Sequence, residues 1–215
     1  MLRALASRRG FQFVENPGKP ADLVPLRPIE RQGNVRTVEL PAAVRGRTLD
    51  SQLVLFDLYT QRVSGSGNSK TYWDGYETFI TFKSADRQWP HFEFAAIARL
   101  KADSITSQLM NLVVNATESI MQNRGLTHVP IPSEPGWQLF VHDVAIADRV
   151  RDALMPLFEK RTGWWVGAKD DALTVLKTAQ KSAAMAMFVP ESELEPYLNE
   201  AIEIERNLRS LATPP

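Results

Sequence analysis

The side chains best suited to acid–base or metal chemistry in this sequence are three histidines and the carboxylates near them. His91, His128 and His142 lie far apart, and none forms an H-x-H or H-E-x-x-H motif. A catalytic or metal site would therefore have to be assembled by folding. Its residues would come from His91, His142, Glu93 and Asp143. This assembly is the basis of an alternative function, an enzyme of undetermined class whose site is built from dispersed His, Asp and Glu residues.

A glycine-rich stretch at residues 65–71, Gly-Ser-Gly-Asn-Ser-Lys-Thr, offers backbone N–H groups and a lysine to a phosphate. A P-loop, however, has glycine directly before the lysine and a helix after the following Ser or Thr. Here Ser69 precedes Lys70, and a predicted strand follows. The stretch also lacks the strand-to-helix context that exposes a serine nucleophile. We therefore predict a structural turn, and we expect no catalytic residue, no metal and no cofactor.

Aromatic residues are the remaining candidates for a functional surface. Several follow the glycine-rich turn directly, and one more is expected opposite them. The adjacent tryptophans at 164 and 165 must point to opposite faces of their strand. An exposed aromatic group of this kind marks a contact surface for a ligand or partner. The predicted binding residues are Tyr59, Tyr72, Trp73, Tyr76, Trp164 and Trp165.

Two long strands are expected to position most of these aromatic residues. The segments 53–63 and 71–83 are rich in β-branched and aromatic residues, and only small, turn-forming residues join them. This pattern predicts a long hairpin. Both of its faces are apolar near Leu53, so that end should be covered on both sides. The end near the turn is polar and should project from the core.

The register of this hairpin follows from the charges that would face each other. Pairing Asp57 with Glu77 would set two carboxylates against one another, which is unfavourable for directly opposed residues. A shift by one residue pairs Asp57 with Thr78 and Tyr59 with Tyr76. We predict the shifted register.

The remaining elements follow from apolar periodicity and from Gly and Pro residues. Strands are predicted at Val35–Val44, at Trp89–Ile97 as a short strand or sheet edge, at Trp137–Val141, and as a second hairpin at Trp164–Ala168 and Leu173–Lys177. Helices are predicted before Gly10, at Asp103–Asn123, from Asp148 to Phe158, and from Glu191 to Leu211. The expected fold is α+β, with a mainly antiparallel sheet and a central long hairpin packed by three to four helices. An N-terminal α+β subdomain (1–126) and a C-terminal β-α-β-β-α subdomain (127–215) are expected, or one continuous domain.

Composition narrows the classes of function. The 215 residues are 44% hydrophobic, 23% charged and free of cysteine. Thiolate nucleophiles, cysteine-based zinc sites and iron–sulfur clusters are thereby excluded, and a reducing compartment is indicated. The formal net charge is +0, so no overall field attracts nucleic acid. We expect a soluble, cytoplasmic protein without a transmembrane segment, since no apolar run approaches the ~20 residues that span a bilayer.

Charge is nevertheless uneven along the chain. Residues 1–50 carry nine basic residues against five acidic ones, and residues 190–215 carry six glutamates against two arginines. The basic and acidic ends could pair within the molecule or face different partners. A peripheral contact of the basic N-terminal region with the cytoplasmic face of a membrane is a minor alternative.

Three pieces of the sequence resemble an uncharacterised bacterial family, a domain of unknown function often found behind N-terminal membrane helices. They are Phe56-Asp-Leu-Tyr59 followed by Gly65-Ser-Gly67, Gly163-Trp164 after a basic helix end, and Pro190-Glu-Ser-Glu-Leu194 at the start of the last helix. The resemblance implies no catalytic residues. The chain departs from the family in lacking the membrane anchor and in having the predicted helix Asp103–Asn123.

The expected function is therefore that of a non-enzymatic protein-interaction or scaffolding module. The projecting hairpin with its aromatic residues is the predicted contact surface. Its partner would be another protein or a second copy of the chain.

Overall fold

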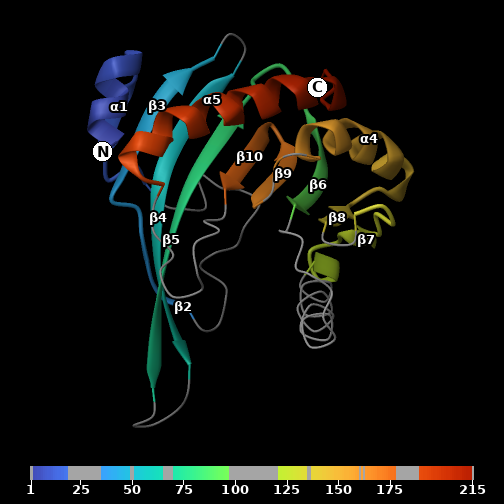
Figure 1. The fold of residues 1–215 in the computed structure, drawn as a ribbon, viewed down its shortest axis with the longest axis horizontal. Coiled ribbons are helices and arrows are strands. Elements are labelled where there is room, and N and C mark those ends of the chain that lie inside the picture. Colours follow the sequence, from blue (N-terminus) through green and yellow to red (C-terminus); the bar gives the residue numbers. More distant parts are fainter. Residues whose placement is uncertain are drawn as a thin grey trace.

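The chain forms one open antiparallel β-sheet with α-helices on one of its faces (Figure 1). This computed structural model describes residues 2–18, 35–48, 51–64, 70–96, 121–134, 137–159, 161, 163–177 and 189–214. The described sheet has the strand order β1-β3-β4-β5-β10-β9-β6-β8-β7, and β2 pairs with β4 beside this row. Its strands are β1 (Gln12–Glu15), β2 (Val35–Glu39), β3 (Ala42–Arg47), β4 (Gln52–Ser64), β5 (Thr71–Lys83), β6 (Trp89–Ala96), β7 (Thr127–Val129), β8 (Trp137–Val141), β9 (Trp164–Asp170) and β10 (Ala172–Lys177).

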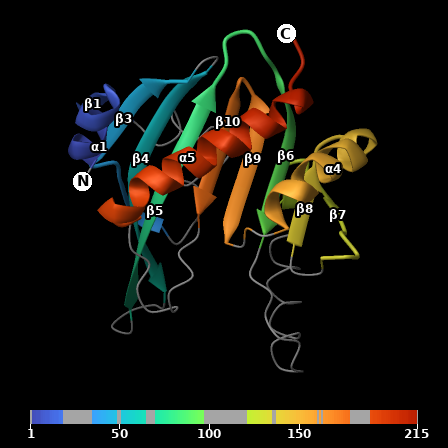
Figure 2. The ribbon, with the colours of Figure 1, turned by 45° about the horizontal axis from the view of Figure 1, so that its top comes forward.

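The α-helices of the described residues all lie on the same face of this sheet (Figures 1 and 2). They are α1 (Leu2–Arg9), α4 (Ala147–Phe158) and α5 (Glu191–Leu208), with short 3-10 turns η2 (Val144–Ile146) and η3 (Arg209–Leu211). Helix α5 crosses the strands and buries Leu194, Leu198 and Ile204 against them. Each large apolar side chain buried in this way contributes about 1.5–3 kcal/mol. The protein is thus α+β with a mainly antiparallel sheet, as predicted.

Both faces of the sheet carry an apolar cluster. The larger cluster lies between the sheet and the helices and includes Leu53, Leu55 and Ile80. A second, smaller cluster lies on the opposite face, where the rings of Phe56 and Phe79 stack with their centroids 5.4 Å apart. Burial on both faces explains why β4 reads as a continuous apolar run rather than as an alternating one.

The central hairpin has the predicted register. Strands β4 and β5 are each 13 residues long, and Asp57 pairs with Thr78, Tyr59 with Tyr76 and Leu53 with Phe82. The end near Leu53 is buried on both faces, which confirms that part of the prediction.

The strand predicted at Val35–Val44 is wrong in its bounds. Two strands, β2 and β3, are separated there by Leu40 and Pro41, and β3 extends to Arg47. Pro41 has no N–H group to donate to a neighbouring strand, so pairing is interrupted at this point. Both strands pair with β4, β3 along its first half and β2 along its second half.

The segment predicted as a short strand or a sheet edge forms strand β6, which lies inside the sheet, so the strand is confirmed and the edge position is wrong. It pairs with β9 on one side and with β8 on the other. The missing N–H of Pro90 is accommodated by an irregularity in the pairing with β9 between Trp89 and Phe92. The predicted helix Asp103–Asn123 lies almost entirely outside the described residues.

The predicted second hairpin is present as β9 and β10, with Asp170 in the left-handed conformation at its turn (φ 52°). Strand β10 pairs with β5, and β9 pairs with β6. Strands from the segments 1–126 and 127–215 therefore alternate in a single sheet.

A close contact on β3 requires glycine. The ring of Phe11 lies over Gly46, and a Cβ added at Gly46 would stand 2.6–2.7 Å from three of its ring carbons. This ring joins the end of α1 to the sheet, since the Phe11 N–H also donates to the Ala6 carbonyl.

We predict that Gly46→Ala lowers the free energy of unfolding by about 1–3 kcal/mol because the methyl group displaces the Phe11 ring. Urea denaturation of the single variant and of the Gly46→Ala, Phe11→Ala double variant measures this. In the Phe11→Ala background the added methyl group meets no ring, so its cost should vanish. An equal cost in both backgrounds would contradict the contact.

Candidate functional site

The central hairpin leaves the core at the level of Asp57 and Thr78. Before Asp57, strand β4 pairs with β3, and after Thr78, strand β5 pairs with β10 from Phe79 to Lys83. Beyond it, β2 runs beside β4, and the ribbon projects past the start of α5 (Figure 1). The distal half of the hairpin is therefore the most protruding strand structure among the described residues.

Asp57 is a buried carboxyl group at the base of the projecting part, with 5% of its surface exposed. The hydroxyl of Thr78 donates to Asp57 Oδ1 at 2.7 Å and accepts from the Val189 N–H at 3.1 Å. Burial raises the pKa of Asp57 to about 6, although the Thr78 hydrogen bond acts in the opposite direction. Tyr197 of α5 donates to the Thr78 carbonyl at 2.7 Å. The start of α5 is thereby attached to the level at which the hairpin emerges.

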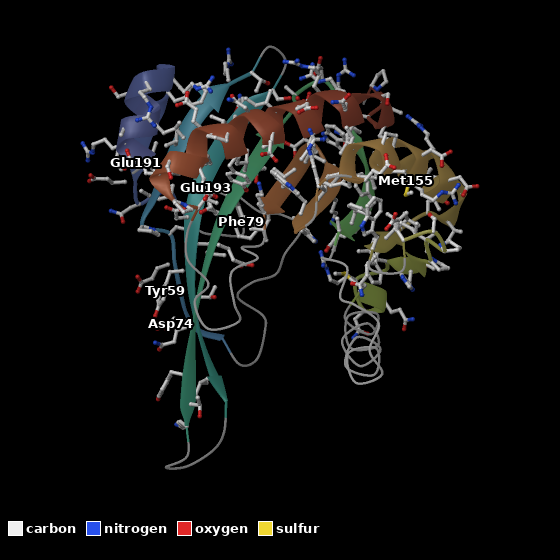
Figure 3. All side chains as sticks on the ribbon, in the orientation of Figure 1. Tyr59, Asp74, Phe79, Met155, Glu191 and Glu193 are labelled. Carbon is white, nitrogen blue, oxygen red and sulfur yellow. The ribbon has the colours of Figure 1, made fainter. Side chains whose placement is uncertain are left out.

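Beyond Asp57, the same side of the ribbon carries a tyrosine, an aspartate and a glutamine in mutual contact. The Tyr59 hydroxyl donates to Asp74 Oδ1 at 2.8 Å. Gln61 Nε2 lies 3.2 Å from the same Asp74 oxygen and 3.3 Å from the Tyr59 hydroxyl. Figure 3 shows Tyr59 and Asp74 on the projecting ribbon. We call this surface the distal hairpin face and define it by Glu39, Tyr59, Gln61, Tyr72 and Asp74.

Alternation along the strands assigns these residues to one face. Tyr59 and Gln61 follow Leu55 and Asp57 at steps of two on the helix side of β4. Tyr72 and Asp74 lie at the corresponding positions of β5, and Glu39 pairs directly with Tyr59. Tyr72 is 47% exposed. On the opposite side of the ribbon, Thr60 is buried (3% exposed) and packs against Gly75.

The structure separates the six predicted binding residues into three groups. Tyr59 and Tyr72 lie on the distal hairpin face. The side-chain atoms of Trp73 and Tyr76 lie outside the described part of the structure.

Trp164 and Trp165 point to opposite faces of β9, as predicted, but neither is exposed. Trp164 is 2% exposed, and its ring stacks on that of Tyr197 at a centroid distance of 5.4 Å. Trp165 is 7% exposed and belongs to the apolar cluster on the opposite face. The expectation that one of them marks a contact surface is not supported, because both faces of the sheet are buried at this strand.

Acidic residues at the start of α5 were not part of the predicted site. Glu191 and Glu193 lie in the first turn of this helix, next to Val189, which bonds to Thr78 (Figure 3). Their negative charges interact favourably with the positive end of the helix dipole. The glutamate-rich composition of this segment was visible in the sequence, but its position beside the hairpin depends on pairing between residues more than 100 positions apart.

The basic N-terminal helix and the acidic C-terminal helix pair within the molecule. Arg9 Nε lies 2.9 Å from Glu195 Oε1, and Arg8 lies 3.5 Å from Glu195 and 3.9 Å from Glu191. Arg9 also donates to the Asn199 side-chain carbonyl at 2.7 Å. Much of the positive charge of α1 is therefore directed toward α5.

Two of the three histidines come together on the face of the sheet opposite the helices. The rings of His91 and His142 are nearly parallel, with centroids 5.8 Å apart, and Glu93 follows His91 by two residues on the same face of β6. Burial, followed by the charges of Lys169 and Arg124, lowers the pKa of His91 to about 4. His91 is therefore a neutral imidazole at physiological pH.

Most of the candidate catalytic residues make structural contacts. Glu93 is 1% exposed and forms a salt bridge of 2.5 Å with Arg124. His142 Nδ1 lies 2.9 Å from the Gly125 carbonyl oxygen, and Asp143 caps η2 by accepting from the Ala145 N–H at 2.9 Å. Within the described ranges, no group of three or more His, Asp or Glu residues is arranged to hold a metal ion.

Comparison of the chain with protein-family models, with curated proteins and with solved structures found no match. The resemblance to the bacterial family of unknown function therefore stays a prediction. No helix in the described part of the chain has the length and apolar character needed to cross a membrane.

We predict that Asp57→Asn stabilises the protein at neutral pH. Because the pKa of Asp57 rises from an ordinary value of 3.8 to about 6 on folding, its contribution to stability is present below about pH 4 and is lost as the pH passes 6. The loss amounts to at most about 3 kcal/mol. Asparagine keeps the acceptor for Thr78 and carries no charge, so stability at pH 7.5 should rise toward this amount.

Urea denaturation of wild type and Asp57→Asn at pH 4.5, 6.0 and 7.5 measures the difference. The exposed Asp152→Asn on α4 is the matched control and should follow the wild type. If the free energy of unfolding of Asp57→Asn depended on pH as strongly as that of wild type, a group other than Asp57 would be responsible.

We predict that Arg124→Met destabilises the fold by about 3–5 kcal/mol because it leaves the buried Glu93 without its salt-bridge partner. The double variant Arg124→Met, Glu93→Met should recover most of this loss, because it removes both charges. Thermal and chemical denaturation of the two single variants and the double variant test the coupling. Additive losses would contradict a direct ion pair.

Proposed function

We propose that this chain is a non-enzymatic protein-interaction or scaffolding module that contacts its partner through the distal hairpin. The partner is another protein or a second copy of the chain. The observation that carries the proposal is the three-stranded ribbon of β2, β4 and β5. It projects past the described helices, and Tyr72 on it has 47% of its surface exposed.

A projecting ribbon with an exposed tyrosine suits a contact role on physical grounds. Tyrosine has a large apolar ring and a polar hydroxyl, and it loses little side-chain entropy when it is ordered at an interface. In the described structure only Tyr72 and Val144 are large hydrophobic residues with substantial exposure, and Val144 lies far away along the sheet on η2. The hairpin therefore offers the better-suited surface.

Rigid placement also supports the proposal. The emerging strands are held by the hydrogen bonds around Thr78, and the ribbon gains a third strand from β2. Three strands are more stable than an isolated two-stranded hairpin, which is marginal in water. The tyrosine side chains are thus presented on a preorganised element, which reduces the entropic cost of binding.

We also propose that the protein acts in the cytoplasm. The absence of cysteine supports this, because a reducing compartment provides no disulfide stabilisation.

We predict that the hairpin mediates self-association if the partner is a second copy. Size-exclusion chromatography with light scattering should show a wild-type oligomer that dissociates in the Trp73→Ala, Tyr76→Ala variant. The exposed Val144→Ala serves as a control and should keep the wild-type mass. A wild-type monomer at high protein concentration would remove self-association from the proposal.

A further inference from the structure

We propose that the start of α5 is a proton-dependent latch, which stays attached to the central hairpin while Asp57 is protonated and is released locally when Asp57 ionises. The released segment is 189–195, which ends directly before Pro196. This device is independent of the proposed function, because it concerns how α5 is held on the hairpin and not what the ribbon binds. The burial of Asp57, the hydrogen bonds around it and a weak point in α5 support it.

Asp57 is a buried carboxyl group without a cationic partner. It is 5% exposed, its hydrogen bond comes from the Thr78 hydroxyl, and none of the ion pairs among the described residues includes it. An unpaired carboxylate is costly in such surroundings, so burial favours the protonated form. The resulting pKa of about 6 makes Asp57 mostly protonated at pH 5 and mostly ionised at pH 7.5.

The charged groups of the described elements around Asp57 do not neutralise its carboxylate. At the end of β10, Lys177 lies 3.6 Å from Glu200 of α5. Glu39 of β2 and Glu77 of β5 are themselves acidic, so neither offers a partner. The positive charge of the amino terminus favours ionisation of Asp57, but it has a smaller effect than burial, which opposes ionisation. Burial therefore governs the protonation state of Asp57.

The Thr78 hydroxyl links Asp57 to the start of α5. It donates to Asp57 Oδ1 at 2.7 Å and accepts from the Val189 N–H at 3.1 Å. An ionised carboxylate can accept about four hydrogen bonds, and the described residues supply one. Hydration of ionised Asp57 therefore requires water to enter between the hairpin and Val189, at the expense of the Val189 bond. The Tyr197 hydroxyl, which donates to the Thr78 carbonyl at 2.7 Å, keeps the rest of α5 in place.

The first turns of α5 have a weak connection to the rest of the helix. Pro196 has no N–H, so it gives no helical hydrogen bond to the carbonyl at position 192. Pro190 at the N-cap makes no side-chain cap bond, and the first turn closes through the N–H groups of residues 193 and 194. Leu194 is fully buried and is the apolar anchor of this segment. The segment can therefore detach at Pro196 while the remainder of α5 stays helical.

The contacts of this segment with α1 lie on the surface. Arg9 lies 2.9 Å from Glu195, and Arg8 lies 3.5 Å from Glu195 and 3.9 Å from Glu191. Their side chains are 32–54% exposed, and exposed ion pairs of this kind contribute little to stability. The protonation of Asp57 is therefore the main variable that decides whether the segment stays attached.

Hydrogen exchange at pH 5.0 and 7.5, measured by mass spectrometry and expressed as protection factors, tests the latch. At pH 7.5 the segment 189–195 should be roughly tenfold less protected in wild type than in Asp57→Asn, because ionisation favours the open state. Asparagine keeps the acceptor for Thr78 and carries no charge, so the two proteins should be equally protected there at pH 5.0. The exposed Asp152→Asn on α4 is the matched control and should follow wild type at both pH values.

The variant Thr78→Val tests the connection separately, since it removes the hydroxyl that joins Asp57 to Val189. In this variant the segment should be poorly protected already at pH 5.0. Equal protection of wild type and Asp57→Asn at pH 7.5, or wild-type protection in Thr78→Val at pH 5.0, would overturn the inference. So would a wild-type segment that is as protected as α4 at pH 7.5, because its release would then require unfolding of the whole fold. Circular dichroism melting curves at both pH values establish that the variants are folded.

Discussion

The pairing of β4 with β5 is the constraint on which the rest of the structure depends. It runs over the full 13 residues of both strands and opposes Asp57 to Thr78 rather than to Glu77. Because side chains alternate along a strand, a slip by one residue would exchange the two faces of one strand. Leu55 and Ile80 would then no longer meet on the same side under α5. One register thus determines the position of both apolar clusters.

Thr78 connects this pairing to the C-terminal helix. Its hydroxyl bonds to Asp57 and to the Val189 N–H, and its carbonyl accepts from Tyr197. The ring of Tyr197 in turn stacks on Trp164 of β9. A chain of contacts therefore runs from the hairpin through α5 to the second hairpin, and it defines the point beyond which the ribbon projects past the described helices. Asp57 is buried at this point, and its burial raises its pKa to about 6.

The two faces of the sheet carry different kinds of residues. The helix side carries the large core and continues into the tyrosines and carboxylates of the distal hairpin face. The opposite side carries the smaller apolar cluster together with His91, His142 and the buried Glu93–Arg124 pair. On that side Glu93 pairs with Arg124, and His142 Nδ1 lies 2.9 Å from the Gly125 carbonyl oxygen.

Local pattern and composition were sufficient for several features. The register of the hairpin followed from the repulsion between Asp57 and Glu77, the turn at Asp170 from its position between two apolar runs, and the absence of thiol chemistry from the lack of cysteine. Each of these depends on residues that are neighbours in the chain or that face each other across one short turn. Such interactions are encoded within a few dozen residues.

Other features were decided only by tertiary structure. The central place of β6, the burial of both Trp164 and Trp165, and the meeting of His91 with His142 depend on how strands distant in the sequence are ordered within the sheet. The start of α5, with its glutamates, likewise lies beside the hairpin because the Val189 N–H bonds to Thr78. The sequence alone determined which residues could form strands, turns and charged segments, whereas the order of strands determined which of them share a surface. Long-range pairing sets that order, and local propensity carries no information about it.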